Sequence, residues 1–190
     1  MSSNKDNGLP TDSSLAGEHF EVHQTQSHDD YKPDPSRSLP LSPAQQALMD
    51  DIIALYSCQP TRERVKRYTP DCVYDDQFVC ARNRFKMAGQ WFALPSLFAE
   101  SRNESYEVNE QSTTINALVS LSLDPDTADS DFPQVKYHKD QANGKDYSHG
   151  EPGFAFKKWQ ADKEAGKMDS EDVKAFKEDD KEKYEEPVRK

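Results

Sequence analysis

A histidine and an aspartate two positions apart, His138 and Asp140, could act together as an acid–base pair. Residues Val135–Asp140 alternate in a way that predicts a β-strand, in which side chains two positions apart lie on the same face. If that face lines a cavity, the pair lies over it, with Tyr74 or Tyr137 as a hydrogen-bond donor. If it is the outer face, both are ordinary surface residues, and a register step of one residue decides between the two cases.

Two adjacent aspartates, Asp75 and Asp76, form the second candidate for acid–base chemistry. They interrupt residues 72–80, a stretch that is otherwise typical of a strand. A carboxylate in an apolar cavity has a raised pKa, which suits removal of a proton next to a carbonyl group. The alternative is structural, since both carboxylates could instead cap backbone amides where the strand turns.

The aromatic residues Trp91 and Phe92 belong to a strongly apolar helical stretch, where they either fill the core or line a ligand site. The three cysteines, Cys58, Cys72 and Cys80, follow no metal-binding spacing and are interpreted as reduced, mostly buried residues. The sequence has no phosphate-cradling glycine loop and no nucleophile motif. We therefore predict neither a metal site nor a cofactor.

Charge and hydropathy limit the partners that this chain is expected to have. Its 190 residues carry a formal net charge of -11. An acidic surface repels nucleic-acid backbones and anionic membranes, so neither is an expected partner. No apolar run approaches the ~20 residues that span a bilayer, and the first residues lack the pattern of a secretory signal. The expected location is the cytoplasm, with the nucleus also open to a chain of this size.

The composition changes along the chain predict one domain between two polar tails. Residues 1–42 are rich in Ser, Asp and Pro and poor in aliphatic residues, which predicts disorder. Residues 43–160 carry the apolar patterns and form the predicted domain. Residues 161–190 are mostly Lys, Glu and Asp, so we expect a marginal, exposed helix or disorder there.

Within the domain, helical patterns come first and strand patterns follow. Ser42 is the expected cap of a helix that begins at Pro43 and carries a wide apolar stripe. A short helix, a strand and a third helix are predicted next, at residues 62–68, 72–80 and 83–98. Later strands are predicted at residues 105–112, 113–123 and 135–140. This order predicts an α+β fold in which a curved antiparallel or mixed sheet wraps a long helix.

The stretch Tyr68-Thr-Pro-Asp-Cys-Val-Tyr-Asp-Asp76 resembles the first-strand segment of the nuclear transport factor two-like (SnoaL-like) superfamily. Residues 135–140 resemble the final strand of fungal and plant members of unassigned function. The resemblance covers roughly residues 44–159 and implies a cone-shaped domain. The sequence departs from many relatives near Ala142, where they carry a Trp, and its loop at 124–132 is longer than a simple hairpin.

The resemblance also implies a site, because Asp76 stands where ketosteroid-isomerase-like relatives carry their catalytic base. On that basis the cone binds, isomerises or dehydrates a small apolar carbonyl compound without a cofactor. Asp76 is then the base, His138 its partner and Tyr74 the hydrogen-bond donor. The residues expected around the ligand are Asp140, Trp91, Phe92 and Tyr137.

A second function stays open at this point, because the same fold hosts both enzymes and binding modules. Side chains could fill the cone, and the domain would then be a non-catalytic interaction module, for instance a homodimer through an open sheet face. An empty apolar cavity of roughly a few hundred Å³ would favour the ligand site. The sequence leaves open whether the chain is an enzyme.

Overall fold

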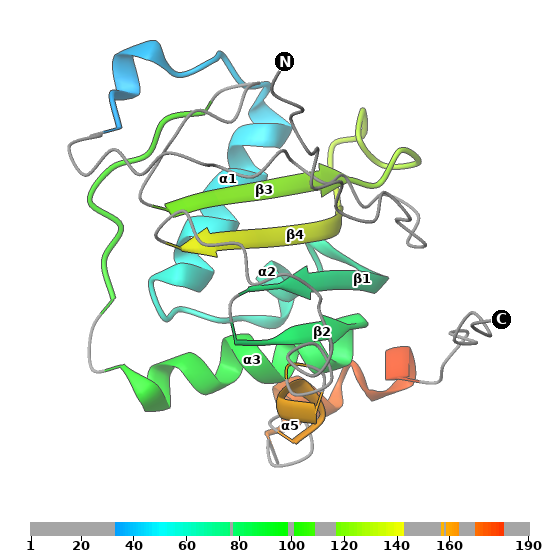
Figure 1. The fold of residues 1–190 in the computed structure, drawn as a ribbon. Helices are drawn as coiled ribbons and strands as arrows, with labels where there is room; N and C mark the ends of the chain where they lie inside the picture. Colours follow the sequence, from blue (N-terminus) through cyan, green and yellow to red (C-terminus); the bar gives the residue numbers. More distant parts are fainter. Residues whose placement is uncertain are drawn as a thin grey trace, which may run out of the picture.

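The computed structural model describes residues 33–76, 78–98, 101–108, 117–142, 157, 159–163 and 170–180. These residues form an α+β fold with one sheet (Figure 1), which confirms the predicted class. In chain order, the elements are η1 (Pro35–Arg37), α1 (Pro43–Tyr56), α2 (Arg62–Val65), β1 (Tyr68–Asp75), β2 (Cys80–Arg82), α3 (Arg84–Leu97), β3 (Ala117–Leu123), β4 (Val135–Ala142), α5 (Glu171–Lys174) and η2 (Lys177–Asp180).

The helix starts follow from local capping. Ser42 accepts a hydrogen bond from the Gln45 amide while the Gln45 side chain accepts one from the Ser42 amide, and Pro43 fills the first helical position. This arrangement satisfies amides that a helix start otherwise leaves without partners. Thr61 caps α2 in the same way, through the Arg64 amide. The cap predicted at Ser42 is confirmed.

The sheet is mixed, with the strand order β2-β1-β4-β3. The outer pairs are antiparallel, whereas β1 and β4 in the centre run parallel and place Tyr74 beside His138. The register of β1 against β4 shifts between Tyr68 and Val73. Pro70 lies in that interval, and a proline cannot donate a hydrogen bond to a neighbouring strand.

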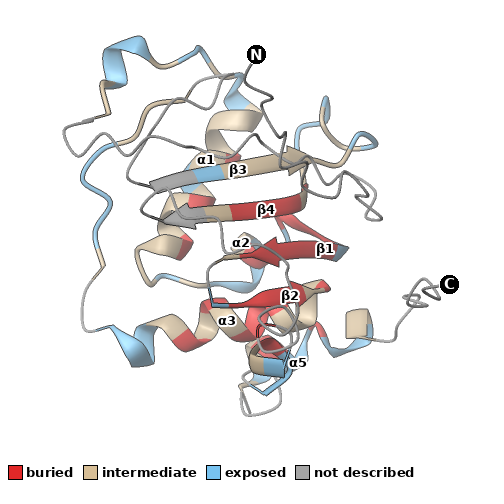
Figure 2. Ribbon diagram, viewed as in Figure 1, coloured by how far each residue is buried: buried red, intermediate tan, exposed pale blue. Residues whose placement is uncertain are grey.

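The main core lies between the sheet and two helices. In Figure 1, α1 crosses behind β3 and β4, and α3 lies beneath β2. Leu48, Ile52 and Leu55 of α1 and Met87 and Trp91 of α3 are buried together with the facing residues of β1, β2 and β4. Figure 2 shows β1, β2 and β4 as largely buried, whereas the described side chains of β3 are exposed or intermediate. The apolar stripe predicted for the first helix therefore does face the core.

The second face of the sheet carries a smaller cluster of Val73, Cys80 and Tyr137. Asp75 lies on this face as well, and its Oδ1 is 2.6 Å from the Nζ of Lys157, with both side chains buried. Removing an ion pair from water is costly unless the two charges meet closely, as they do here. Because Tyr137 belongs to the cluster on this second face, its side chain lies on the face opposite His138.

Several predicted boundaries were wrong in part. The strand predicted at 72–80 is a hairpin, because β1 ends at Asp75 and β2 begins at Cys80. Residues 101–108 form no strand, although one was predicted from 105. The third helix, predicted at 83–98, spans Arg84–Leu97 as expected, and Leu97 and Phe98 at its end are exposed. The remainder of the strand predicted at 105–112 lies outside the described residues.

Parts of both predicted tails make ordered contacts. Leu39 N–H donates to the Val108 carbonyl, and Asp34 N–H donates to the Glu107 carboxylate. At the other end, Val173 and Phe176 are buried against the domain, whereas the sequence predicted an exposed or disordered segment. These few apolar residues are enough because α3 offers a surface for them, which a sequence pattern read in isolation does not show.

Candidate functional site

His138 lies at the centre of an aromatic cluster on the face of the sheet that α1 and α3 cover. Its side chain is 0% exposed. The ring centroids of Tyr74, Tyr56, Tyr68 and Trp91 lie 4.9, 5.9, 5.9 and 6.1 Å from that of His138. The sheet register therefore turns His138 and Asp140 toward the face that α1 and α3 cover, rather than toward the outer face of the sheet.

Two tyrosine hydroxyls flank the His138 imidazole. The Oη of Tyr56 lies 2.9 Å from Nε2, and the Oη of Tyr68 lies 2.8 Å from Nδ1. Tyr56 also donates to Oδ2 of Asp140 at 2.9 Å. These contacts connect α1, β1 and β4 through a single continuous set of hydrogen bonds.

Burial keeps the imidazole neutral. The absence of water around His138 lowers its pKa to about 3, because the charged form loses its hydration. Burial likewise raises the pKa of Tyr56, Tyr68 and Tyr74 well above that of a tyrosine in water. At neutral pH these four groups are therefore uncharged, and His138 does not take up a proton.

Asp140 is the titratable group of the cluster whose pKa lies closest to neutrality. Burial raises its pKa to about 6; the hydrogen bond from Tyr56 opposes this shift, and the charge of Asp76 adds to it. Asp140 is only partly buried. It therefore combines some access to solvent with a pKa at which a carboxylate works as either an acid or a base near neutral pH.

Asp76 lies at the end of β1, with both of its oxygens already in hydrogen bonds. Its Oδ1 accepts the amides of Phe78 and Val79, each at 2.6 Å, and its Oδ2 accepts the Tyr74 hydroxyl at 3.0 Å. Burial raises its pKa, and these hydrogen bonds hold the rise back. These contacts with backbone amides match the capping role that was the structural alternative for Asp76.

The other predicted ligand contacts are spread over the fold. Trp91 is 1% exposed and lies in the core beside His138, and Phe92 packs against the same core while partly exposed. Tyr137 lies on the far face of the sheet and does not join the cluster. The expectation that Tyr137 and His138 share a site is therefore wrong, because neighbours along a strand point to opposite faces.

Tyr56 and Tyr68 were not among the predicted site residues. Tyr56 stands at the last position of α1, beside its apolar stripe, where it reads as a core residue. Tyr68 is the first residue of β1 and of the segment that resembles the family, and its spacing alone gives it no site role. A buried phenol needs a partner for its hydroxyl, and that requirement was the one sequence-level signal that could have directed attention to them.

The cysteines and the described carboxylates offer no competing site. Cys58, Cys72 and Cys80 are free thiols; burial raises the pKa of Cys80 to about 12 and that of Cys72 further, so these two remain protonated. This agrees with their interpretation as reduced residues. Within the described ranges, no three His, Cys, Asp or Glu side chains are grouped so that they could hold a metal ion.

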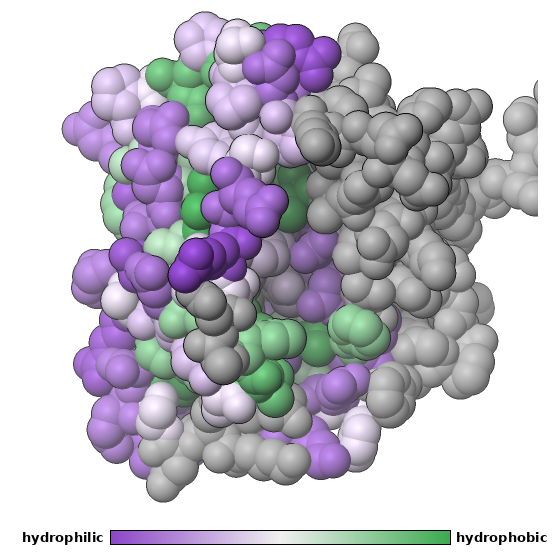
Figure 3. Space-filling model, turned by 90° about the vertical axis from the view of Figure 1, so that its left-hand side faces the viewer, coloured by the Kyte–Doolittle hydropathy of each residue, from purple (hydrophilic) through white to green (hydrophobic). Residues whose placement is uncertain are grey.

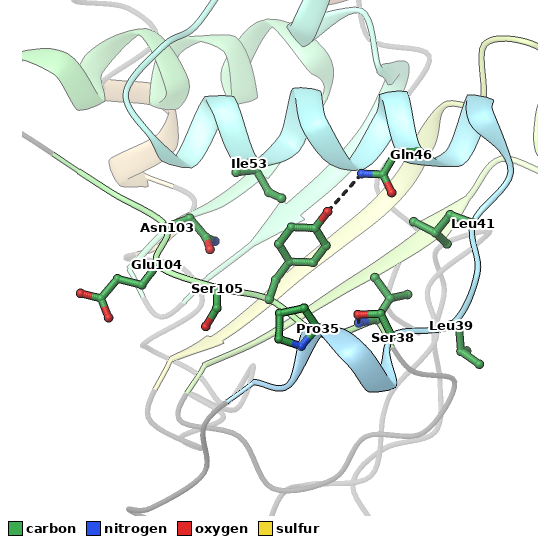
Figure 4. Close-up of a pocket in the computed structure, with 11 residues that line it drawn as sticks. Pro35, Ser38, Leu39, Leu41, Gln46, Ile53, Asn103, Glu104 and Ser105 are labelled. Atoms are coloured by element: carbon green, nitrogen blue, oxygen red, sulfur yellow. Dashed lines mark hydrogen bonds between the residues drawn. The ribbon is translucent and has the colours of Figure 1, made fainter.

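A pocket of about 470 Å³ lies away from the aromatic cluster, between α1 and two segments without regular strands (Figure 4). Gln46 and Ile53 of α1 form one wall, and residues 35–41 and 103–108 form the others. Gln46 Nε2 donates to the Tyr106 hydroxyl at 3.1 Å across it. The lining contains neither His138 nor either of the two aspartates, so this pocket is not the predicted cavity.

On the side of the molecule where α3 ends, apolar and polar groups are interspersed (Figure 3). Leu97 and Phe98 are exposed at this end of α3.

Among the helices that the structure describes, none is both long and apolar enough to cross a bilayer. Comparison of the chain with protein-family models, with curated proteins and with solved structures found no match.

Proposed function

We propose that this chain is a nuclear transport factor two-like (SnoaL-like) domain that binds a small apolar carbonyl compound and exchanges a proton with it through Asp140. The family assignment is supported by the order of the elements, by the packing of α1 on a mixed sheet, and by the position of the residue 68–76 motif on β1. In this proposal the sheet curves around α1 as a cone.

The observation that carries the functional proposal is the state of Asp140. It is a partly exposed carboxylate with a pKa of about 6, and its Oδ2 is held by Tyr56. Among the described residues, its Oδ1 has no hydrogen-bond partner. An ionised carboxylate with one oxygen fixed and one available can remove a proton from a carbon next to a carbonyl and return it elsewhere, as isomerisation and dehydration require.

The neighbouring residues fit supporting roles. His138 is completely buried and so is out of reach of a ligand, while Asp76 has both oxygens in hydrogen bonds. The charge of Asp76 helps to raise the pKa of Asp140. When two carboxylates repel each other in a site with little water, the pKa of one of them rises toward the pH at which it works. We therefore assign the base to Asp140 and an electrostatic role to Asp76.

The direct test is proton exchange in D2O. We expect the full chain to exchange protons next to the carbonyl of small cyclic ketones, followed by 1H NMR, at a rate that rises as pH passes about 6 and Asp140 ionises. Asp140→Asn should lower this rate by on the order of 100-fold, because general-base catalysis contributes at least that much. Asp126→Asn, at an exposed turn, is the control and should leave it unchanged.

A non-catalytic interaction module is the second candidate. It is favoured by the filling of the space around His138 with four aromatic rings. A homodimer would have to use a surface other than the second sheet face at β1 and β4, because Tyr137 and Lys139 are already buried there. No exchange with any ketone, no small molecule retained in native mass spectrometry, and a dimer in sedimentation would together favour this alternative.

A further inference from the structure

The hydroxyl of Tyr56 has two partners and a single proton. It lies 2.9 Å from His138 Nε2 and 2.9 Å from Asp140 Oδ2. An ionised carboxylate can only accept hydrogen bonds, and charge-assisted hydrogen bonds are the stronger ones. The Tyr56 proton therefore goes to Asp140, and the contact with His138 has to be made with a proton from the imidazole.

This assignment determines every other proton in the set. A neutral imidazole carries one N–H, so a proton on Nε2 leaves Nδ1 as an acceptor. Tyr68 lies 2.8 Å from Nδ1 and is the donor to it. The hydrogen bonds then run in one direction, from Tyr68 to His138, from His138 to Tyr56, and from Tyr56 to Asp140. Each buried nitrogen and hydroxyl in the series has a partner, as burial demands.

We propose that His138 is a positioning residue, present as the Nε2–H tautomer with Tyr68 donating to Nδ1, that aims the Tyr56 hydroxyl at Oδ2 of Asp140 and leaves Oδ1 as the oxygen that exchanges protons with the ligand. This rests on the proposed function for the role of Oδ1. The direction of the hydrogen bonds is a property of the ligand-free chain and can be measured without a ligand.

In the described part of the chain, the titratable groups near Asp140 include Tyr56, His138 and Asp76. Tyr56 faces it from α1, His138 from its own strand, and Asp76 from the end of β1. Tyr74 lies beside His138 and donates to Asp76. Of these, Tyr56 makes the hydrogen bond that favours the ionised form of Asp140, so changes along the series should reach Asp140 through Tyr56.

The first experiment is 15N NMR of the His138 imidazole in the full ligand-free chain at pH 8. The proposal predicts the Nε2–H tautomer, with Nδ1 at the shift of an unprotonated nitrogen. An Nδ1–H tautomer at that pH would mean that Tyr56 donates to the imidazole instead, and it would overturn the proposal whatever the chain does with ketones.

A matched pair of variants tests positioning against a merely structural role. Tyr56→Phe and Tyr68→Phe each remove one hydroxyl from His138, but only Tyr56 also donates to Asp140, so the pair separates that direct hydrogen bond from a general loosening around the imidazole. The proposal predicts that Tyr56→Phe raises the pKa of Asp140, read from its carboxyl 13C shift, by about one unit, because the ionised form loses a hydrogen bond. Tyr68→Phe should leave that pKa within a few tenths of a unit and preserve the Nε2–H tautomer.

Replacement of the imidazole completes the test. His138→Gln can donate an amide N–H to Tyr56 and accept from Tyr68, so it should retain the pKa of Asp140, whereas His138→Leu should raise it. An unchanged Asp140 pKa in folded His138→Leu would contradict the proposal. If that variant does not fold, His138→Gln and the 15N spectrum decide: a raised Asp140 pKa in His138→Gln, or an Nδ1–H tautomer in the wild-type chain, would refute it.

Discussion

Exposure separates the roles of the polar side chains in the aromatic cluster. His138 is fully buried and neutral, whereas Asp140 reaches partly into solvent and titrates near pH 6. A group that exchanges protons with a ligand has to be able to touch it, so in the proposed function the two residues that the sequence pairs as equals have different roles. Tyr56 connects them, because its hydroxyl is within hydrogen-bond distance of both.

The raised pKa of Asp140 also affects the stability of the fold. A carboxyl whose pKa rises from 3.8 to about 6 on folding favours the folded state below the unfolded pKa, and this contribution is lost as pH rises through about 6. Asp140→Asn stays neutral and keeps an acceptor for Tyr56. Relative to wild type, we expect its free energy of unfolding to increase by up to about 3 kcal/mol between pH 4 and pH 7.5.

Urea denaturation of both proteins at the two pH values measures this difference. Asp126→Asn, in an exposed turn, should show none. A stability difference between Asp140→Asn and wild type that is the same at both pH values would show that Asp140 has an ordinary pKa in the folded chain.

The elements that place these residues are held by contacts on both faces of the sheet. On the core face, α1 brings Tyr56 over β4, and the parallel pairing of β1 with β4 brings Tyr74 beside His138. On the second face, Lys157 pairs with Asp75, the residue next to Asp76. The end of β1 is therefore anchored on the side away from the site.

The buried pair of Asp75 and Lys157 should be intolerant of single changes. Lys157→Met removes the positive charge that lies 2.6 Å from the buried Asp75 carboxylate and is expected to cost about 3 kcal/mol or more. Adding Asp75→Asn removes that charge and should recover most of the loss. Lys177→Met, at an exposed position, is the control. Chemical denaturation tests this, and equal stabilities of the single and double variants would contradict it.

The contact of the C-terminal segment with α3 gives a second prediction for the elements. Phe176 is 4% exposed, and the Arg84 guanidinium lies 5.2 Å from its ring centroid, while Arg84 also pairs with Asp179 at 2.7 Å. Phe176→Ala should cost about 3 kcal/mol, as loss of a buried phenylalanine does. Phe78→Ala removes the same atoms from a side chain that is 60% exposed and should cost much less. Similar melting temperatures for the two variants would show that α5 and η2 are not docked.

For the molecule as a whole, buried His138 and partly buried Asp140 give stability opposite pH dependences. The lowered pKa of His138 means that the unfolded chain takes up a proton below pH 6.5 that the folded chain refuses until about pH 3, so stability falls on acidification. Asp140 acts in the opposite sense between 3.8 and about 6. Over pH 4 to 6 the two contributions offset each other in the wild-type chain.

Single variants should reveal the two slopes. In His138→Gln the acid-induced loss of stability between pH 6.5 and 4 should become smaller, or reverse, because the opposing contribution of Asp140 remains. In Asp140→Asn the loss over the same range should become steeper. The midpoint of urea unfolding across this range measures both, and parallel curves for the three proteins would contradict the pKa values on which the site is built.

Local chemistry accounts for the parts that the sequence predicted well. Ser42 with Pro43, and Thr61, cap helices because the hydrogen bonds involved span only a few residues. The alternation around residues 135–140 predicts a strand with His138 and Asp140 on one face, and β4 has them there. These features depend on spacing along the chain, which is available before any tertiary contact is known.

Only the tertiary structure decided which residues meet. The pairing of β1 with β4, and the packing of α1 across them, select Tyr56 and Tyr68 as partners of His138 and place Tyr137 on the other face. A shift of one residue in that register would have reversed the faces without changing any local pattern. The burial of Phe176 likewise depends on the surface of α3. Burial requires two segments to pack together, whereas the composition of the C-terminal segment describes that segment alone.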